Sequence, residues 1–377
     1  MTIGYDGLWA INNRTSRGNY CRLLIEAASK EVKAEKFYIY SDKPNNSPHL
    51  VALLANSRVS LKTPHYSFST ILWRTGGIRK DLKRHHVRIF HGLSGILPLR
   101  TWGSRTHWVL SVNDLYFRYN PTQYSALYRL WSKMMTKRSC RKAERIIVPS
   151  QWGKEDLIKT YHLPEDRIDV VPPSYSDIFK QPVPNWALED VRRTNNLPQR
   201  YVLAMGPLDP YKNLKTLIKA IALTRDTDVK LVIVGNVTNH YKRELKPAIA
   251  HHGVSDRVIH LKHIRTSDLP ALYQMATIMA CPAVNSYYSI AMLEAMAMGI
   301  PVIVSAQTAL EQEGGEAVMT AGRDDAQQWA DAIDALLDPQ QHQHYEQLAR
   351  AKAEEYSLER MGKALQESYD KIPHHND

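Results

Sequence analysis

The chain has 377 residues, which is too long for one typical domain and sufficient for two, and its 44% hydrophobic and 23% charged residues are ordinary for a globular protein. It shows neither an apolar run of the roughly 20 residues that cross a bilayer nor a leader with a basic flank and an apolar core, so we expect a cytosolic protein rather than a secreted or integral membrane one. Residues 1–180 hold 29 Lys and Arg against 14 Asp and Glu, whereas residues 181–377 hold 20 against 24, which predicts that the first half faces an anionic partner: a nucleic acid, an anionic membrane or a phosphorylated substrate.

Strand and helix patterns alternate along the first half of the chain. Short apolar runs predict buried strands at residues 2–5, 37–40, 87–90, 107–112, 145–149 and 168–171. Helical patterns lie among them at residues 20–28, 124–143 and 151–161. Alternation of this kind predicts a parallel sheet with helices on both faces.

Residues 172–184 contain four prolines and no periodicity, which predicts a linker between two domains. The alternation then restarts, with strands predicted at 201–205, 230–235, 258–261, 278–281 and 301–305 and helices at 214–223, 268–275 and 289–298. We therefore expect an α/β protein with a Rossmann-like domain over residues 1–175, a second over residues 176–355, and a C-terminal helix within 356–377 that returns to the first domain. Ligands of such sheets bind at the carboxyl ends of the strands, so a cleft between the two domains is expected.

The most informative segment is residues 281–305, CPAVNSYYSIAMLEAMAMGIPVIVS. A strand ends near its start, a polar loop follows, and Ser289 is a good N-cap for the next helix. The N–H groups of this loop therefore lie at the positive end of a helix, which suits a diphosphate. Glu294 lies further along the helix among apolar residues, and it is either a ligand for ribose hydroxyls or an exposed carboxylate on a helix face.

A second segment, residues 201–220, reads YVLAMGPLDPYKNLKTLIKA. Gly206 ends a predicted strand, and Lys212 lies in the loop before a helix. A lysine near a helix N-terminus is a common phosphate ligand, and a solvated loop lysine is the alternative.

Both segments resemble the retaining family-4 glycosyltransferases (glycosyl transferases group 1), whose GT-B fold has two Rossmann-like domains facing each other across a cleft. The first segment matches the family's Glu-Gly-Phe-Gly-x-x-x-x-Glu-Ala-x-Ala-x-Gly-x-Pro-Val pattern at Glu294, Ala295, Ala297, Gly299, Pro301 and Val302. The second resembles its Gly-Arg-Leu-x-x-x-Lys pattern at Gly206 and Lys212. The resemblance implies that Glu294 holds the nucleotide ribose and that Lys212 binds the donor diphosphate and acts in catalysis.

The same resemblance implies further donor-binding residues. Gly235 and Asn236, in VIVGN, and His263 and Ile264, in the run 258–282, would lie beside the base. The loop before the helix would surround the diphosphate and the sugar with Ser286, Tyr287, Tyr288, Ser289 and Ile290. The sequence departs from the family pattern at Ser286, where a Glu usually contacts the donor sugar, at Tyr287 and Ser289, in place of glycines, and at Pro207, in place of an Arg.

The first half resembles the family more loosely. IGYDGLWAINNRTSRGNYCRLL is similar to its opening strand and Gly-rich loop, with Gly18 at the glycine that approaches the donor phosphates. LSVNDLYFRYNP matches a Thr-Ile-His-Asp pattern with Asn113 in place of the His, and we assign Asn113 a catalytic role. His91, in FHGLSGILPL, together with Asp114 and Arg118, is assigned to the acceptor.

No cofactor or metal is expected, because in this family cationic and backbone groups stabilise the departing diphosphate and the nucleotide sugar is a substrate. Residues 226–228 spell DTD, the metal-binding pattern of another glycosyltransferase fold, but a solvated turn is expected there. Three widely spaced cysteines, Cys21, Cys140 and Cys281, indicate neither a disulfide framework nor a zinc site.

Two basic clusters lie in the first half. One is a stripe spaced four apart on the predicted helix 124–143: Arg129, Lys133, Lys137 and Arg141. The other, Arg79, Lys80, Lys83 and Arg84, follows an aromatic and aliphatic segment that contains Tyr66, Phe68, Leu72 and Trp73. Basic residues beside bulky apolar ones suit an anionic membrane surface, with a solvated helix face as the alternative. No recognised nucleic-acid motif accompanies the charge, so nucleic acid is not expected as a partner.

We therefore expect a retaining, metal-independent hexosyltransferase that moves a sugar from a nucleotide-diphosphate sugar to a glycan or lipid-linked acceptor. Its expected setting is cell-surface polysaccharide or lipopolysaccharide synthesis, in the cytoplasm and peripherally on the inner face of the membrane. The alternative is a catalytically impaired GT-B subunit that binds nucleotide or serves as a scaffold in a glycosylation complex, which Ser286, Asn113 and Pro207 favour. The base, the sugar and the acceptor stay open.

Overall fold

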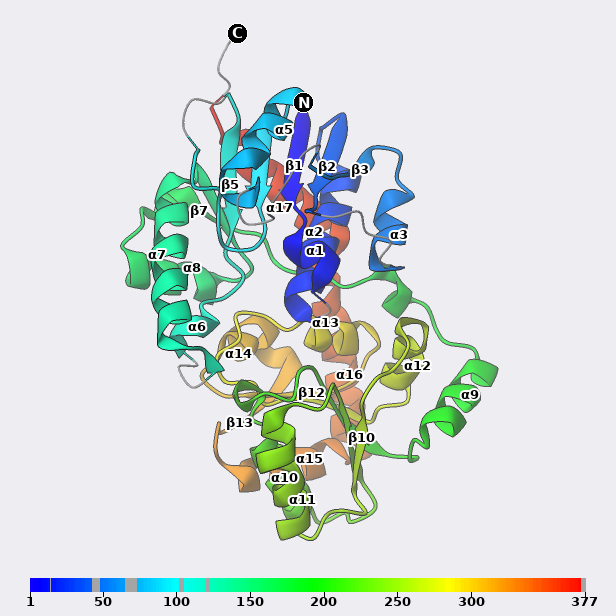
Figure 1. Cartoon of the computed structure of the whole chain (residues 1–377). Helices are drawn as coiled ribbons and strands as arrows, with labels where there is room; N and C mark the ends of the chain where they lie inside the picture. Colours follow the sequence, from blue (N-terminus) through cyan, green and yellow to red (C-terminus); the bar gives the residue numbers. More distant parts are fainter. Residues whose placement is uncertain (14, 43–47, 65–72, 102–104, 120–122, 374–377) are drawn as a thin grey trace. The chain divides into compact units, whose positions relative to one another are not determined.

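The computed structural model describes residues 1–13, 15–42, 48–64, 73–101, 105–119 and 123–373. The chain divides into two compact units (Figure 1). The first comprises Met1–Ser174 and Leu358–Asp377, and the second comprises Tyr175–Ser357. Within the part of the chain that is described, no helix is both long enough and apolar enough to span a bilayer.

The described part of the first unit contains a seven-stranded parallel sheet in the order β3-β2-β1-β4-β5-β6-β7. Its strands are β1 (Thr2–Asp6), β2 (Lys36–Tyr40), β3 (Val59–Lys62), β4 (Ile89–Gly92), β5 (His107–Ser111), β6 (Arg145–Val148) and β7 (Ile168–Val170). In the register, Ile3 of β1 lies opposite Phe37 on one side and Ile89 on the other. The central strands are buried along nearly their whole length, as expected where helices cover both faces of a parallel sheet.

The helices of the first unit are α1 (Leu8–Asn12), α2 (Ser16–Glu31), α3 (Pro48–Leu54), α5 (Ile78–Arg84), α6 (Tyr116–Tyr119), α7 (Ala126–Lys142), α8 (Gln151–Tyr161) and α17 (Leu358–Asp370). The last of these, red in Figure 1, packs against α2 although more than 300 residues separate them. Gly362 makes this approach possible, because a Cβ there would lie 2.6 Å from Cβ of Glu31. The C-terminal helix is thus part of the first unit.

The second unit contains a six-stranded parallel sheet in the order β10-β9-β8-β11-β12-β13. Its strands are β8 (Tyr201–Met205), β9 (Lys230–Val234), β10 (Val258–Leu261), β11 (Ile278–Cys281), β12 (Val302–Ser305) and β13 (Val318–Ala321). Its helices are α9 (Asn185–Asn195), α10 (Leu214–Leu223), α11 (Lys246–His251), α12 (Leu269–Gln274), α13 (Ile290–Ala297), α14 (Ala309–Gly314), α15 (Ala326–Leu336) and α16 (Pro339–Ala353).

Alternate residues of β8 enter two separate hydrophobic clusters, one on each face of this sheet. Tyr201 and Leu203 belong to a cluster with residues of α12 and α13, whereas Val202 and Ala204 belong to a cluster with residues of α10, α11 and α15. Successive side chains of a strand point to opposite faces, so both faces are covered by helices. The expected fold class, two Rossmann-like α/β units with parallel sheets, is confirmed.

Two strands escape the sequence patterns. β3 and β13 each lie at one edge of their sheet, are four residues long and carry partly exposed side chains. An edge strand is covered less completely than a central one, so its apolar pattern can be weaker. The other two edge strands, β7 and β10, and the predicted central strands all appear within a residue or two of the expected places.

Candidate functional site

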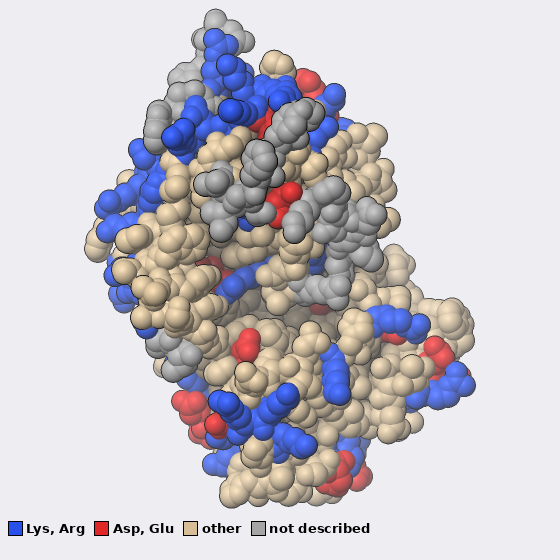
Figure 2. Space-filling model, viewed as in Figure 1, with Lys and Arg blue, Asp and Glu red and all other residues tan. Residues whose placement is uncertain are grey.

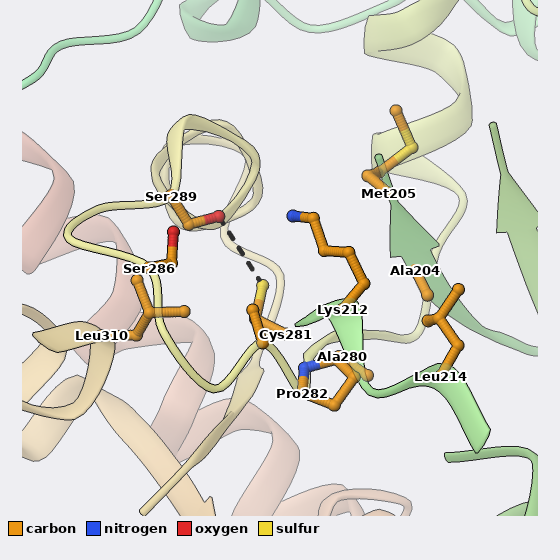
Figure 3. A pocket seen from close by; sticks show the side chains of 11 residues that line it. Ala204, Met205, Lys212, Leu214, Ala280, Cys281, Pro282, Ser286, Ser289 and Leu310 are labelled. Atoms are coloured by element: carbon orange, nitrogen blue, oxygen red, sulfur yellow. Dashed lines mark hydrogen bonds between the residues drawn. The ribbon is translucent and has the colours of Figure 1, made fainter. Parts of the chain in front are cut away.

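The strand order of the second sheet reverses between β8 and β11, and a pocket lies at the carboxyl ends of these two strands. In such sheets the point of reversal is where ligands bind, because the loops diverge there and leave a crevice. The pocket is lined by Ala204, Met205, Lys212, Leu214, Ala280, Cys281, Pro282, Ala283, Ser286, Ser289 and Leu310 (Figure 3).

Gly206 makes room for Lys212 at this pocket. It follows β8 with a φ of +125°, which side chains other than glycine's rarely allow, and its N–H donates to the carbonyl of Val234 at 3.1 Å. A Cβ at this position would lie 2.9 Å from Cε of Lys212. The aliphatic part of Lys212 therefore passes directly over the backbone of Gly206.

The Lys212 ammonium points into the space beside Ser289 and Cys281 (Figure 3). The side chain is half-buried, and desolvation lowers the pKa of its ammonium, although the neighbouring Cys281 and Asp209 oppose this shift. Among the described residues, Lys212 forms no ion pair within the chain. A partly desolvated cation in this situation is well placed to bind an anion.

The N-terminus of α13 faces the same pocket. Ser289 is its N-cap, and the Ser289 hydroxyl accepts a hydrogen bond from N–H of Met292 at 3.2 Å. Ser286 stands in the loop before the helix and donates its hydroxyl to the carbonyl of Tyr288 at 2.7 Å. The pocket thus combines an ammonium, two hydroxyls and the positive end of a helix, which is a suitable environment for a diphosphate.

Two tyrosines and an isoleucine assigned to the donor are buried in the second unit: Tyr287, Tyr288 and Ile290. The loop therefore exposes mainly its backbone and the two serine hydroxyls. A donor-binding role of these three side chains stays a prediction.

Glu294 lies inside the unit and not on an exposed helix face, since only 8% of its surface is exposed. Its Oε2 accepts a hydrogen bond from the hydroxyl of Tyr273 at 2.8 Å. Burial raises the pKa of Glu294 to about 7, and the Tyr273 hydroxyl partly offsets this rise. Sequence reasoning missed Tyr273, which belongs to α12, and its only signal was its place in the run DLPALYQ.

The residues expected beside the nucleotide base gather at the carboxyl ends of β9 and β10. The Gly235 N–H donates to the carbonyl of Leu261 at 2.9 Å, which ties the two strand ends together. A Cβ on Gly235 would lie 2.1 Å from the carbonyl oxygen of Gly206, so β8 and β9 approach closely here. Asn236 and His263 are exposed at this edge, and Ile264 packs against the core.

The first sheet has its own point of reversal, between β1 and β4. Asp6 ends β1, and its carboxylate accepts hydrogen bonds from Arg74, at 2.8 Å, and from the hydroxyl of Ser94. Sequence reasoning did not select these three residues. The available signal was weak: Asp6 directly follows the predicted strand 2–5, and Ser94 follows the strand that ends at Gly92.

Each of the three residues assigned to the acceptor has neighbours of its own. Asp114 pairs with Arg17, whose Nε lies 2.6 Å from its Oδ2. Arg118 is exposed, with its guanidinium 5.9 Å from the ring centre of Tyr119.

His91 is fully buried, with 0% of its surface exposed. Its Nδ1 lies 2.8 Å from the Tyr369 hydroxyl and its Nε2 lies 2.8 Å from the Ser111 hydroxyl. Burial lowers the pKa of His91 to about 3, so the ring is neutral. The acceptor assignment of His91 is therefore wrong: the side chain links β4 to β5 and α17 and has no surface for a ligand.

Two more assignments in the first unit change for the same reason. A Cβ on Gly18 would lie 1.8 Å from the carbonyl oxygen of Asn13, so the close approach that requires glycine is to the chain's own backbone and not to a phosphate. Asn113 is 1% exposed and its Nδ2 donates to the carbonyl of Leu93 at 3.4 Å. Its Oδ1 has no hydrogen-bond partner among the described residues. The catalytic assignment of Asn113 has no geometric support.

The DTD segment forms a turn, as expected from its sequence. Asp226 pairs with Arg200 at 2.8 Å, and its Oδ1 accepts a hydrogen bond from N–H of Asp228 at 2.9 Å. Both carboxylates thus have local partners, because the second one also lies 3.9 Å from Arg200.

Comparisons with known proteins agree with this geometry. Residues 189–355 match the family model described as "Glycosyl transferases group 1", and residues 29–176 match the model "Glycosyltransferase Family 4". The chain is 29% identical over 283 residues to the D-inositol 3-phosphate glycosyltransferase of Corynebacterium efficiens, an alignment that covers 70% of this chain and 65% of the relative. It is 23% identical over 224 residues to the O-antigen chain mannosyltransferase RfbU of Salmonella typhimurium, covering 59% of each.

Each of these alignments thus covers less than two thirds of the curated relative's length. Among solved structures, the chain is similar to Anabaena HepE in complex with UDP-glucose, with a TM-score of 0.79 and 15% identity over 99% of this chain and 100% of the other. At this identity the likeness establishes the fold.

Proposed function

This chain belongs to the group 1 glycosyl transferases, and from that premise we propose that it transfers a sugar from a nucleotide-diphosphate sugar to a hydroxyl group of an acceptor. The observation that carries the proposal is the pocket at the point of reversal of the second sheet. There the Lys212 ammonium, which forms no ion pair with any described residue, and the N-terminus of α13 face the same space. Glu294 lies on that same helix, with its carboxylate buried beside Tyr273.

The transfer breaks the bond between the anomeric carbon and the terminal phosphate oxygen and forms a bond from that carbon to the acceptor oxygen. The nucleoside diphosphate leaves with the electron pair of the broken bond, so negative charge grows on the phosphate oxygen. Lys212 and the N–H groups at the start of α13 stabilise this charge, which is the largest contribution that such a site makes to rate. The carboxylate of Glu294 accepts hydrogen bonds from the ribose hydroxyls and fixes the donor in place.

The finer points of the proposal rest on the family and on chemistry. We assign a retaining outcome from the family resemblance, and a metal-independent reaction because Lys212 and the helix N-terminus supply positive charge at the diphosphate. The name of the O-antigen chain mannosyltransferase supports a glycan or lipid-linked acceptor in cell-surface polysaccharide synthesis. The three cysteines are unpaired and buried, which suits the reducing cytoplasm.

The test is a binding screen followed by a turnover assay. Thermal unfolding of the full chain is measured with nucleoside diphosphates and their sugars, because a ligand that binds only the folded state raises the melting temperature. Donors that bind are then incubated with and without glycan and lipid-linked acceptors, in buffer containing EDTA. We expect uridine or guanosine diphosphate sugars to bind and the sugar to be transferred in the presence of EDTA. If no nucleotide of the panel raises the melting temperature of the protein, the proposal is contradicted.

One observation favours a second candidate, a nucleotide-binding subunit without turnover. Ser286 stands where the family pattern has a glutamate, and its hydroxyl is bonded to the carbonyl of Tyr288. Nucleotide binding without donor hydrolysis or transfer, for any acceptor tested, is the result expected of such a subunit. Restoring the carboxylate with Ser286→Glu separates the two candidates further, since only a subunit impaired at this position gains activity.

A further inference from the structure

The outward face of α7 is apolar, although the helix lies on the surface of the first unit. Over its first turns the exposed side chains are large and hydrophobic: Leu127, Leu130, Trp131 and Met134, with 47–81% of each exposed. We call these four residues the apolar row. At 100° per residue they lie within one face of the helix, about 100° wide.

The inward face of the same helix is polar. The buried residues of α7 are Ser132, Thr136, Ser139 and Cys140. Ser139 fixes the orientation, because its hydroxyl accepts from N–H of Leu97 at 2.9 Å and donates to the carbonyl of Met135 at 2.7 Å. A surface helix normally buries its apolar face and exposes its polar one, so the arrangement of α7 is inverted. Rotation of the helix cannot hide the apolar row without breaking the hydrogen bond from Leu97 to Ser139.

Aromatic rings extend the apolar row toward the start of the helix. The ring of Tyr128 stacks on that of Tyr124 with centres 5.2 Å apart, and its other neighbour is Trp131, at 6.1 Å. Tyrosine and tryptophan are enriched where a protein meets the boundary between lipid and water, because each combines an apolar ring with a polar group.

The charges of α7 have a single sign. Its seventeen residues include no acidic one and six basic ones: Arg129, Lys133, Lys137, Arg138, Arg141 and Lys142. Arg129 and Arg138 donate to backbone carbonyls of the unit. The side chains of Lys133, Lys137, Arg141 and Lys142, in contrast, form no ion pair with any described residue. In Figure 2, Lys and Arg gather along the edge of the first unit where α7 runs, beside uncharged side chains.

We propose that α7 is an interfacial helix that binds the surface of a bilayer containing anionic lipids. The apolar row enters the boundary between head groups and acyl chains, and the lysines and arginines beside it bind the lipid phosphates. Charge favours an anionic bilayer over a second copy of the chain, because two facing α7 helices would bring twelve basic residues together and repel each other. The apolar row selects it over nucleic acid, whose backbone offers no apolar surface to Leu127, Leu130 and Met134.

The aromatic and aliphatic segment before α5, which the sequence also suggested for membrane binding, is not used in this inference. Trp73 is buried and its Nε1 donates to Asp81 at 2.7 Å. Tyr66, Phe68 and Leu72 lie outside the described residues. The inference therefore rests on α7 alone, goes beyond the proposed transfer reaction, and depends only on the fold of the first unit.

The experiment is co-sedimentation of the full chain with vesicles of phosphatidylcholine containing phosphatidylglycerol, compared with phosphatidylcholine alone. Two triple variants divide the contributions: L130Q/W131Q/M134Q removes most of the apolar row, and K133Q/K137Q/R141Q removes charge. We expect the apolar variant to bind at least roughly tenfold more weakly at every salt concentration. The charge variant is expected to bind on the order of a hundredfold more weakly at low salt, and to lose the preference for phosphatidylglycerol.

A matched control uses another exposed tryptophan, which lies on a helix of mixed charge. Trp186, in α9, is 74% exposed and shares its helix with two acidic and two basic residues. Trp186→Gln should leave vesicle binding unchanged, whereas the single substitution Trp131→Gln should weaken it. Circular dichroism and thermal unfolding establish that each variant keeps the wild-type fold, which is expected because all substituted side chains point outward.

Three results would overturn the inference. They are wild-type protein that does not sediment with anionic vesicles at low salt, an apolar variant that binds as the wild type does, and a lipid-free wild-type dimer that the apolar variant converts to a monomer. None of these measurements uses turnover, so their outcome is separate from that of the transfer reaction.

Discussion

The hydroxyl of Tyr273 donates a 2.8 Å hydrogen bond to Oε2 of Glu294, and both side chains are buried in the second unit. One residue belongs to α12 and the other to α13. Burial raises the pKa of Glu294 to about 7, so its charge changes close to neutral pH. A ribose that donates its hydroxyls to this side chain needs the ionised form.

Nucleotide affinity should therefore depend on pH through Glu294. Below about pH 7 the carboxyl must lose its proton to accept from the ribose, so affinity should fall by up to about tenfold per pH unit as the pH drops from 7 toward 5. Isothermal titration of the wild type and of Glu294→Gln measures this. The nucleotide's own phosphate titrates equally with both proteins. If the affinity of the wild type and that of Glu294→Gln change with pH in parallel, the ribose-binding role of Glu294 is contradicted.

Glu294 should also make the apo protein less stable as the pH rises. Its pKa is about 7 in the folded state against an ordinary 4.5, so between these values the folded state binds more protons and stability falls with increasing pH. Over this window the melting temperature of the second unit should decrease in the wild type relative to Glu294→Gln. Parallel melting curves at pH 5 and pH 7.5 would argue against a raised pKa.

Tyr273→Phe should weaken nucleotide binding without touching the ligand. The Tyr273 hydroxyl lowers the pKa of Glu294, so its removal raises that pKa and moves the pH profile of binding to higher pH. Loss of the buried hydrogen bond should also cost about 1–3 kcal/mol of stability. The combination Tyr273→Phe with Glu294→Gln is the control, since it should show no shift relative to Glu294→Gln alone.

Lys212→Met should lower turnover more than donor binding. The ammonium opposes the charge that grows on the leaving diphosphate, and removal of one such group commonly costs about 100- to 1000-fold in kcat. Methionine keeps much of the side chain's length, so the packing over Gly206 is preserved. Lys215→Met, on the exposed face of α10, is the matched control and should leave kcat unchanged. If Lys212→Met keeps the wild-type kcat, Lys212 has no role in stabilising the leaving diphosphate.

Tyr369→Phe should destabilise the first unit and leave the acceptor KM unchanged. The substitution removes the partner of His91 Nδ1 and of the Tyr5 hydroxyl, two buried groups, at a cost of about 1–3 kcal/mol. Chemical unfolding and acceptor kinetics measure the two effects. A raised acceptor KM with unaltered stability would return His91 and its neighbours to the acceptor site.

The sequence by itself determined the fold class and the place of the pocket in the second unit. Buried central strands of a parallel sheet read as apolar runs, so their alternation with helices was visible without any knowledge of packing. The pocket was visible for a related reason: Lys212, Ser286 and Ser289 each lie in a short loop directly after a strand, where the order of elements alone fixes the place of a residue. β3 and β13, each at one edge of its sheet, carried no such signal, whereas the edge strands β7 and β10 did.

The tertiary structure decided which side chains are buried and which distant residues meet. His91 lies near the carboxyl end of β4 and Asn113 follows β5, yet packing by α17 and by Leu93 buries both side chains. Tyr273 reaches Glu294, and Arg74 reaches Asp6, only after the chain has folded, since 21 and 68 residues separate the partners. The tertiary structure also decided the orientation of α7. The helical period alone places Leu127 and Ser132 on opposite sides of the helix. The contact with Leu97 shows which side faces the protein and which faces outward.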